Sequence, residues 1–307
     1  PPVNLPSAEE LRCPVIIILK QSWLRIKTSL IRNSWTPNPL SMIHLWDICV
    51  AAITTGREVI RMLNEETRRK LRLLNIGEFV EELEIQQQDP QTLALPFDDR
   101  FQMLADSVYQ RKYNDKVQRL IKNARLRLPK ADIHDVLYID KRPLNRGIIA
   151  GLASCRFVDE CHSIVFQGYP SSGKTFLGCA MAKEACRGQH KTRYIRLPDL
   201  LEEYAEKSVV PGGKNKVLNK YAAFKVLVLD EWLMPELSKA DVEFLLELTE
   251  RRFDSTSTIF CTLYKREDWV KRLRSGTYAE SIVERFSHNT IWVETGAVNM
   301  RQYLSHA

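Results

Sequence analysis

The sequence predicts an α/β domain built on a parallel sheet and preceded by an all-helical region. Helix-like and strand-like segments alternate after residue 140, which is typical of parallel strands joined by crossover helices. Five short apolar segments in that part indicate buried strands, whereas helical periodicity dominates the part before it. Glycine is scarce, at 12 of 307 residues, which also favours helices.

The chain is expected to have three parts. Residues 1–61 hold 6 of the 14 prolines and 3 of the 6 tryptophans and have poor helical periodicity. We interpret them as an N-terminal extension, either upstream or poorly ordered sequence, and hypothesise that Met62 is the natural start. Residues 62–140 form the expected helical domain, and residues 141–307 form the expected α/β domain.

Local signals place the individual elements. Asn64 followed by two glutamates is typical of a helix N-cap with an acidic first turn, and a break is expected at Asn75-Ile76-Gly77. A long helix should run from Pro96 to about Leu128, because its apolar residues recur every three or four positions. The expected strands are 163–167, 192–197, 225–229, 258–262 and 290–293, with helices near 174–187, 198–207, 238–253 and 278–286.

The second half of the long helix is strongly basic. Residues 111–130 contain eight lysines and arginines and a single acidic residue, in a chain of net charge +7. This pattern favours a helix that contacts the phosphates of nucleic acid, although a plain exposed charged face would show it too. The candidate DNA-binding residues are Lys112, Lys116, Arg119, Lys122, Arg125 and Arg127.

The composition is that of an ordinary globular protein, with 44% hydrophobic and 27% charged residues. It excludes a mostly disordered chain, a collagen-like fibre and a disulfide-rich mini-protein. The longest apolar run, Val15–Leu19, is far shorter than the roughly 20 residues of a membrane span, so no membrane association is expected. The seven cysteines contain no C-x-x-C pair, which favours reduced thiols and a cytoplasmic protein.

The clearest functional motif matches G-x-x-x-x-G-K-[ST] in full and lies between a predicted strand and a predicted helix. Such a loop wraps phosphates with its backbone N–H groups, and the start of the next helix adds a favourable dipole. Lys174 should reach the β- and γ-phosphates of ATP, and the Thr175 hydroxyl should ligate Mg²⁺. The predicted nucleotide-binding residues are Gly168, Tyr169, Pro170, Ser171, Ser172, Gly173, Lys174, Thr175 and Phe176.

The second motif is an apolar strand that ends in Asp230-Glu231. Asp230 is expected to hold Mg²⁺ as a Walker B carboxylate, and Glu231 to polarise the attacking water. An apolar run ending in Asp-Glu is a weak signal alone. Its place 56 residues after Lys174 in an α/β pattern makes the prediction specific.

Three further residues are candidates for work on the γ-phosphate. Thr262 ends a predicted strand and could orient the attacking water, or be an ordinary strand-end threonine. Arg285 is a candidate arginine finger toward a neighbouring subunit; the alternative is a surface ion pair with Glu280 or Glu284. Arg301 is a candidate second sensor of the γ-phosphate, for which a purely structural role is equally open.

Taken together, these motifs resemble the IstB family, the ATP-binding helper proteins of an insertion-sequence transposon, which are related to the DnaC helicase loaders. The resemblance covers about residues 62–302. In the α/β part it is carried by Gly168–Thr175, Asp230–Leu233, Thr258–Thr262 with Trp269, Ile282–Phe286 and Asn299–Arg301. In the helical part it is carried by Lys70–Arg72, Asp89-Pro90, Leu95–Arg100 and Ala124–Pro129.

The resemblance implies an AAA+ ATPase of a bacterial-type cytoplasm that converts ATP to ADP and phosphate. It further implies binding to duplex DNA, oligomerisation through the ATP interface and assistance to a partner transposase. The roles carried over are nucleotide binding and hydrolysis for Lys174, Thr175, Asp230 and Glu231, sensor 1 for Thr262 and the finger for Arg285.

One departure from the family pattern bears on hydrolysis. Leu263 stands where the family usually has an amide residue after the sensor hydroxyl, and a leucine cannot orient a water. The Ser171-Ser172 pair also replaces more usual small or apolar residues, which a backbone cradle should tolerate. Two alternatives therefore stay open: a replicative helicase loader, which would share every motif, and an ATP-binding DNA clamp with little or no hydrolysis, which Leu263 favours.

Overall fold

A computed structural model describes residues 64–305. The predicted extension 1–61 and the proposed start at Met62 lie outside the described residues. The chain divides into two compact units, with the boundary between Ala94 and Leu95. The long basic helix and the segment that follows it therefore belong to the unit that holds the sheet, whereas the sequence placed them in a helical domain ending at residue 140.

The described part of the smaller unit contains three helices: α3 (Glu65–Leu73), α4 (Glu78–Gln88) and α5 (Pro90–Leu93). The predicted N-cap is confirmed, because the Asn64 side chain accepts a hydrogen bond of 2.8 Å from the backbone N–H of Thr67. The predicted break between the first two helices is also confirmed, at Asn75, which has a positive φ of 56°.

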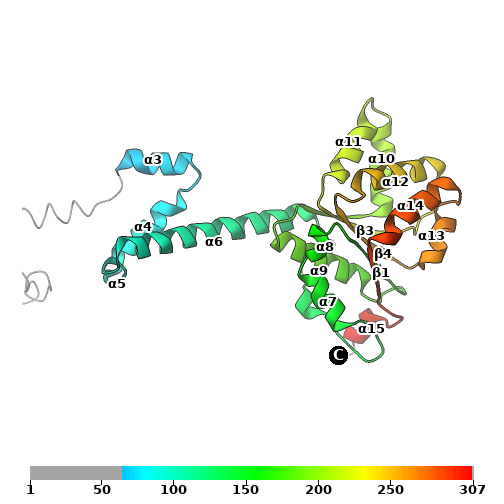
Figure 1. Cartoon of the computed structure of the whole chain (residues 1–307), viewed down its shortest axis with the longest axis horizontal. Helices are drawn as coiled ribbons and strands as arrows, with labels where there is room; N and C mark the ends of the chain where they lie inside the picture. Colours follow the sequence, from blue (N-terminus) through cyan, green and yellow to red (C-terminus); the bar gives the residue numbers. More distant parts are fainter. Residues whose placement is uncertain (1–63, 306–307) are drawn as a thin grey trace, which may run out of the picture. The chain divides into compact units, whose positions relative to one another are not determined.

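The larger unit is built on a sheet of five parallel strands in the order β2-β3-β4-β1-β5. Parallel strands need crossover connections, and helices supply them in this unit (Figure 1). The predicted α/β fold with a parallel sheet and a P-loop between its first strand and the next helix is confirmed. The strands are β1 (Ser163–Gln167), β2 (Thr192–Arg196), β3 (Val226–Trp232), β4 (Ser257–Thr262) and β5 (Thr290–Glu294).

Ten α-helices in the described part of the larger unit surround this sheet. Those that the sequence predicted agree within a residue or two, apart from the end of the longest helix. The short helices α7, α8, α11, α13 and α15 were not predicted. The helices are α6 (Phe97–Ala124), α7 (Arg146–Ala153), α8 (Arg156–Asp159), α9 (Lys174–Arg187), α10 (Leu197–Ser208), α11 (Gly213–Ala222), α12 (Lys239–Arg252), α13 (Arg266–Arg272), α14 (Thr277–His288) and α15 (Met300–Ser305).

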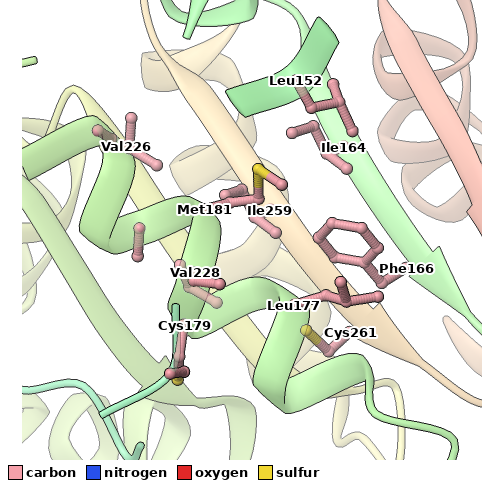
Figure 2. Close-up of a cluster of buried hydrophobic side chains, with 14 of the residues drawn as sticks. Leu152, Ile164, Phe166, Leu177, Cys179, Met181, Val226, Val228, Ile259 and Cys261 are labelled. Atoms are coloured by element: carbon pink, nitrogen blue, oxygen red, sulfur yellow. The ribbon is translucent and has the colours of Figure 1, made fainter. Parts of the chain in front are cut away.

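Two apolar clusters fill the two faces of the sheet, so the unit has three layers. One face carries α9 together with the C-terminal part of α6 and with α7 and α8, and the other carries α10 to α14. Figure 2 shows the first cluster, in which Leu177 and Met181 of α9 lie over Phe166 of β1 and Val228 of β3. All four side chains are at most 1% exposed, so α9 and the loop before it are fixed to the sheet.

The C-terminal half of α6 packs against α9 and the edge strand β2. Val117 and Ala124 are buried there, and the Tyr113 hydroxyl donates a 2.6 Å hydrogen bond to the carbonyl of Arg187 at the end of α9. The helix ends at Ala124, before the predicted Leu128, because Arg125 adopts a left-handed conformation with φ 52°. None of the described helices is both long and apolar enough to cross a membrane.

Arg252 joins the ends of several elements on the other face of the sheet. It is 3% exposed and has no acidic partner among the described residues. Its guanidinium donates to the carbonyls of Tyr221, Phe224 and Ser257 at 2.9, 2.8 and 2.6 Å and to the Thr258 hydroxyl at 3.0 Å. These bonds fix the segments that enter β3 and β4, the strands that carry Asp230 and Thr262.

Replacing Arg252 by alanine should lower the free energy of unfolding by about 3–5 kcal/mol, because several buried acceptors lose a charged donor. Urea denaturation followed by circular dichroism measures this. Arg251→Ala is the matched control, since this neighbour bonds to exposed Glu247 and should contribute less than about 1 kcal/mol. Equal losses in the two variants would contradict the assigned role of Arg252.

Candidate functional site

The predicted phosphate-binding loop joins β1 to α9 and is anchored from two sides. The Ser172 hydroxyl lies 2.6 Å from that of Thr295, which itself donates to the carbonyl of Gln167 at 3.0 Å. On the other side, Arg142 donates to the carbonyl of Ser172 at 2.9 Å. Ser172 is fully buried, so the second serine of the loop serves as an anchor and leaves the backbone cradle intact.

Glycine is required at two points of this loop. A Cβ on Gly168 would lie 2.2 Å from the Thr295 hydroxyl, far inside any real contact. Gly173 has a φ of +93°, which side-chain-bearing residues rarely adopt, and it directly precedes the first turn of α9. The loop is therefore shaped to bring its backbone N–H groups and the start of α9 toward an anion.

Lys174 is the first residue of α9, and its side chain reaches back to the start of the loop. Its ammonium donates to the carbonyls of Gly168 at 2.8 Å and Tyr169 at 2.6 Å. Burial lowers the pKa of Lys174, and the nearby Cys261 and Asp230 oppose that shift. The ammonium is thus held at the mouth of the loop, the position in which a P-loop lysine meets phosphate oxygens.

The structure brings the two predicted magnesium ligands together. The Thr175 hydroxyl donates a 2.8 Å hydrogen bond to Oδ2 of Asp230, and the Tyr194 hydroxyl donates to the same oxygen at 2.6 Å. Both ligands are hard oxygens, as Mg²⁺ prefers. The residues therefore fit Mg²⁺.

Glu231 lies at a β-bulge at the end of β3. Leu229 pairs with Phe260 and Trp232 with Thr262, so Asp230 and Glu231 together face one residue of β4. Glu231 has a positive φ of 57° at this bulge. The bulge therefore interrupts the regular alternation of side chains between the two faces of the sheet. Two arginines approach the Oε1 atom of Glu231: Arg127 at 3.2 Å and Arg196 at 3.7 Å.

Thr262 is 1% exposed, and its hydroxyl forms hydrogen bonds with main-chain atoms. It donates to the carbonyl of Trp232 at 3.0 Å and accepts from the N–H of Tyr264 at 3.1 Å. It therefore supports the turn after the Walker B strand in this structure. Its predicted role toward water stays a prediction.

The two candidate arginines near the C-terminal end lie in different surroundings. Arg285 of α14 forms an ion pair with Glu250 and donates to the carbonyl of Ser281 at 2.9 Å. An intramolecular ion pair is thus present, although with a different partner from the two glutamates expected. Arg301 is exposed near the start of α15, one residue after Met300, whose N–H donates to the P-loop carbonyl of Ser171 at 2.9 Å.

The candidate DNA-binding residues fall into two places. Four are exposed on the C-terminal half of α6 or at its end: Lys116, Arg119, Lys122 and Arg125. Lys112 is half-buried on the same helix, and Lys116 also contacts Gln189. Arg127, by contrast, lies beside the Walker B carboxylates.

Several residues of the site carried no recognisable signal in the sequence. Arg142 precedes the loop by about 30 residues in an irregular segment, and Tyr194 lies inside a strand of ordinary alternation. Thr295 is different, because it directly follows β5 and comes two residues after the end of the fifth predicted strand. In a parallel sheet this position falls at the same edge as the P-loop, so it could have been inferred from topology.

Gly168→Ala should weaken binding of a fluorescent ATP analogue at least about 100-fold, because the added methyl group displaces Thr295 and distorts the loop. Fluorescence titration measures the affinity. Gly151→Ala is the control, since nothing lies within 4 Å of a Cβ there, and its affinity should equal that of the parent. Parent-like affinity in Gly168→Ala would show that the loop is not the nucleotide site.

Proteins with related sequences come from mobile elements. The chain is 31% identical to an ATP-binding protein of insertion sequence IS1162 from Pseudomonas fluorescens, over 64% of this chain and 85% of that protein. It is 23% identical to an ATP-binding protein of insertion sequence IS21 from Pseudomonas aeruginosa, over 59% of this chain and 69% of that protein.

Solved structures of similar fold include the DnaC helicase loader, with a TM-score of 0.45, 22% identity and coverage of 53% of this chain and 96% of that one. The replication initiator DnaA, bound to AMPPCP and single-stranded DNA, is similar with a TM-score of 0.47 and 18% identity, over 58% of this chain and 55% of that one. The family model described as "IstB-like ATP binding protein" matches residues 67–306. This chain therefore belongs to the IstB-like family of ATP-binding proteins.

Proposed function

We propose that this chain is an ATP-driven DNA-binding protein that assists the transposase of an insertion sequence. The observation that carries the proposal is the convergence of Lys174, Thr175, Asp230 and Glu231 at one edge of the sheet. A helix with an exposed basic face packs on the same compact unit, so nucleotide and DNA would act on one unit of the chain. The insertion-sequence relatives favour a transposase over a helicase as the partner.

Each residue of the site has a role in ATP hydrolysis that its position allows. Lys174 would bind the β- and γ-phosphates, and Thr175 with Asp230 would hold Mg²⁺, which neutralises the charge that develops on the phosphates. Glu231 would accept a proton from the attacking water at Oε1 or Oε2. Because Oε1 is paired with Arg127, that oxygen must first lose its guanidinium partner.

DNA binding is proposed for the exposed basic face of α6. Lys116, Arg119, Lys122 and Arg125 lie along its C-terminal half and just after it, and long cationic side chains of this kind bind phosphates without reading bases. The buried side of the helix is fixed by Val117 and Ala124. The proposed interface is therefore rigid, sequence-tolerant and dependent on salt.

Oligomerisation through the ATP interface is part of the same proposal. Arg285 would reach the γ-phosphate held by a neighbouring subunit, as an arginine finger does. Its side chain is only 24% exposed and pairs with Glu250 within the chain, so assembly requires that this ion pair opens. A partly exposed ion pair of this kind contributes about 1 kcal/mol, which leaves such an opening accessible.

A second candidate function, an ATP-binding DNA clamp with little hydrolysis, is favoured by two observations. The hydroxyl of Thr262 is occupied by main-chain partners on both sides. The residue after it is Leu263, whose side chain has no hydrogen-bonding group. A water at the γ-phosphate would then be oriented by Glu231 alone, which slows turnover without weakening binding.

ATP turnover with and without duplex DNA separates these functions. The parent chain should hydrolyse ATP faster with DNA, and Glu231→Gln should lower turnover at least about 100-fold while ATP affinity stays within about threefold, because the general base is lost but not the phosphate cradle. Phosphate release and fluorescence titration measure the two quantities. Absence of turnover in the parent, with ATP bound, would establish the clamp instead.

Charge reversal on α6 tests the DNA interface. Replacing Lys116, Arg119, Lys122 and Arg125 together by glutamate should weaken binding to duplexes of unrelated sequence. It should also reduce the slope of log Kd against log salt by about three to four, since each lost phosphate contact removes roughly 0.9. Fluorescence anisotropy at several salt concentrations measures both.

A control variant carries the same change in charge away from this helix. Lys239, Lys265, Arg266 and Lys271 are exposed near or on α12 and α13, and reversing them should leave the salt slope within about one of the parent. If both quadruple variants behave alike, net charge alone governs binding and α6 is an ordinary exposed face.

A further inference from the structure

Arg127, which the sequence assigned to DNA binding, contacts the Walker B carboxylates in the structure. It lies three residues after the last residue of α6, in a segment that is neither helix nor strand. Its Nη1 atom is 3.2 Å from Oε1 of Glu231 and 3.9 Å from Oδ2 of Asp230. These are its only ion pairs among the described residues, and a side-chain hydrogen bond with Tyr194, which itself bonds to Asp230, also raises the pKa of Arg127.

Arg196, the other arginine near Glu231, is differently engaged. It binds Asp199 through two nitrogens, with Nε 2.8 Å from Oδ2, and remains 3.7 Å from Glu231. Arg196 therefore has a carboxylate partner whether or not Glu231 moves. Among the described residues, Arg127 forms ion pairs with the two Walker B carboxylates alone, and Glu231 is the nearer of them.

The ion pair with Arg127 hinders the proposed role of Glu231 as a general base. A general base needs a carboxylate oxygen that is free to accept a proton from water, whereas Oε1 of Glu231 is held by Nη1 of Arg127 at 3.2 Å. The pair is also accessible, because the side chain of Arg127 is 46% exposed and that of Glu231 is 26% exposed. An anion in solution can therefore reach Arg127 without unfolding the site.

The backbone connects Arg127 to the basic helix. Arg125 makes the left-handed turn that ends α6, and Ala124 and Leu126 are buried in the core on either side of it. Arg127 follows directly, two residues from the exposed Arg125. A phosphate chain that binds the end of the basic face therefore comes close to the guanidinium that holds Glu231.

We propose that Arg127 exchanges the Glu231 carboxylate for a phosphate group, and that phosphate binding thereby frees Glu231 to act on water. Arg127 is then a positioning residue that couples phosphate recognition to hydrolysis. This inference rests on the proposed function. The phosphate comes either from the DNA backbone at the end of α6 or from the terminal phosphate of ATP in the P-loop, and the experiment distinguishes the two sources.

The test is a double-mutant cycle on binding, which needs no turnover. Parent, Arg127→Gln, Glu231→Gln and the double variant are titrated with a fluorescent duplex without nucleotide, and separately with ATPγS and ADP. If DNA is the source, Glu231→Gln tightens DNA binding by about two- to fivefold by releasing Arg127, and this gain disappears when Arg127 is already glutamine. If ATP is the source, the same coupling appears in the ratio of ATPγS to ADP affinity.

Arg119→Gln is the matched control. It removes an exposed arginine from α6 that forms no ion pair with Glu231 among the described residues, so Glu231→Gln should have its parental effect in that background. Turnover gives an independent reading: Arg127→Gln should raise the basal rate and reduce its stimulation by the phosphate source.

Identical effects of Glu231→Gln in the parent and Arg127→Gln backgrounds, in both titrations, would overturn the inference while leaving the proposed function intact. A parent chain that binds neither the duplex nor ATPγS would overturn both. The two failures are thus distinguishable by the parent titrations alone.

Discussion

The hydrogen bond between Thr175 and Asp230 is the contact on which the rest of the site depends. It joins the first turn of α9 to the end of β3 at 2.8 Å, and it brings the phosphate loop to the Walker B strand. The bond is possible because β1, β3 and β4 run parallel and end at one edge of the sheet. The surrounding anchors, from Thr295 to Ser172 and from Arg142 to the loop carbonyl, preserve this alignment.

Much of the fold was predictable because its signals are local. Buried parallel strands are short apolar runs, and β1 begins and ends where the sequence placed it, while β2, β4 and β5 differ by one residue. The P-loop was predictable because phosphate binding demands glycines, a lysine and a hydroxyl at fixed spacing. Asp230 and Glu231 were predictable from their place at the end of an apolar strand.

The features that the sequence did not predict depend on long-range contacts. The bulge at Asp230 and Glu231 lengthens β3 beyond the predicted Leu229, and only the register against β4 defines it. Helix α6 ends before the predicted Leu128 because Arg125 adopts a left-handed conformation. Arginine is not a residue type that predicts the end of a helix. The sequence assigned Arg127 to the basic face of the helix, because the residues next to it in the sequence do not indicate that the chain brings it to Glu231.

The long helix α6 contributes both to the sheet and to the proposed DNA interface. One side of α6 covers the edge strand β2, where Arg193 donates to the carbonyl of Asn123 at 3.2 Å, and protects that edge from pairing with other chains. Its other side is exposed and basic. A single element thus stabilises the sheet, presents charge to a polyanion and leads directly into the arginine that contacts the site of hydrolysis.

The central claim is that nucleotide and DNA act on one coupled unit, and the affinity for duplex DNA in two nucleotide states tests it most directly. Coupling between two sites on one protein typically amounts to about 1–3 kcal/mol. We expect the chain saturated with ATPγS to bind duplex DNA at least about fivefold more tightly than the chain saturated with ADP, at the same salt concentration. Equal dissociation constants in the two states would contradict it.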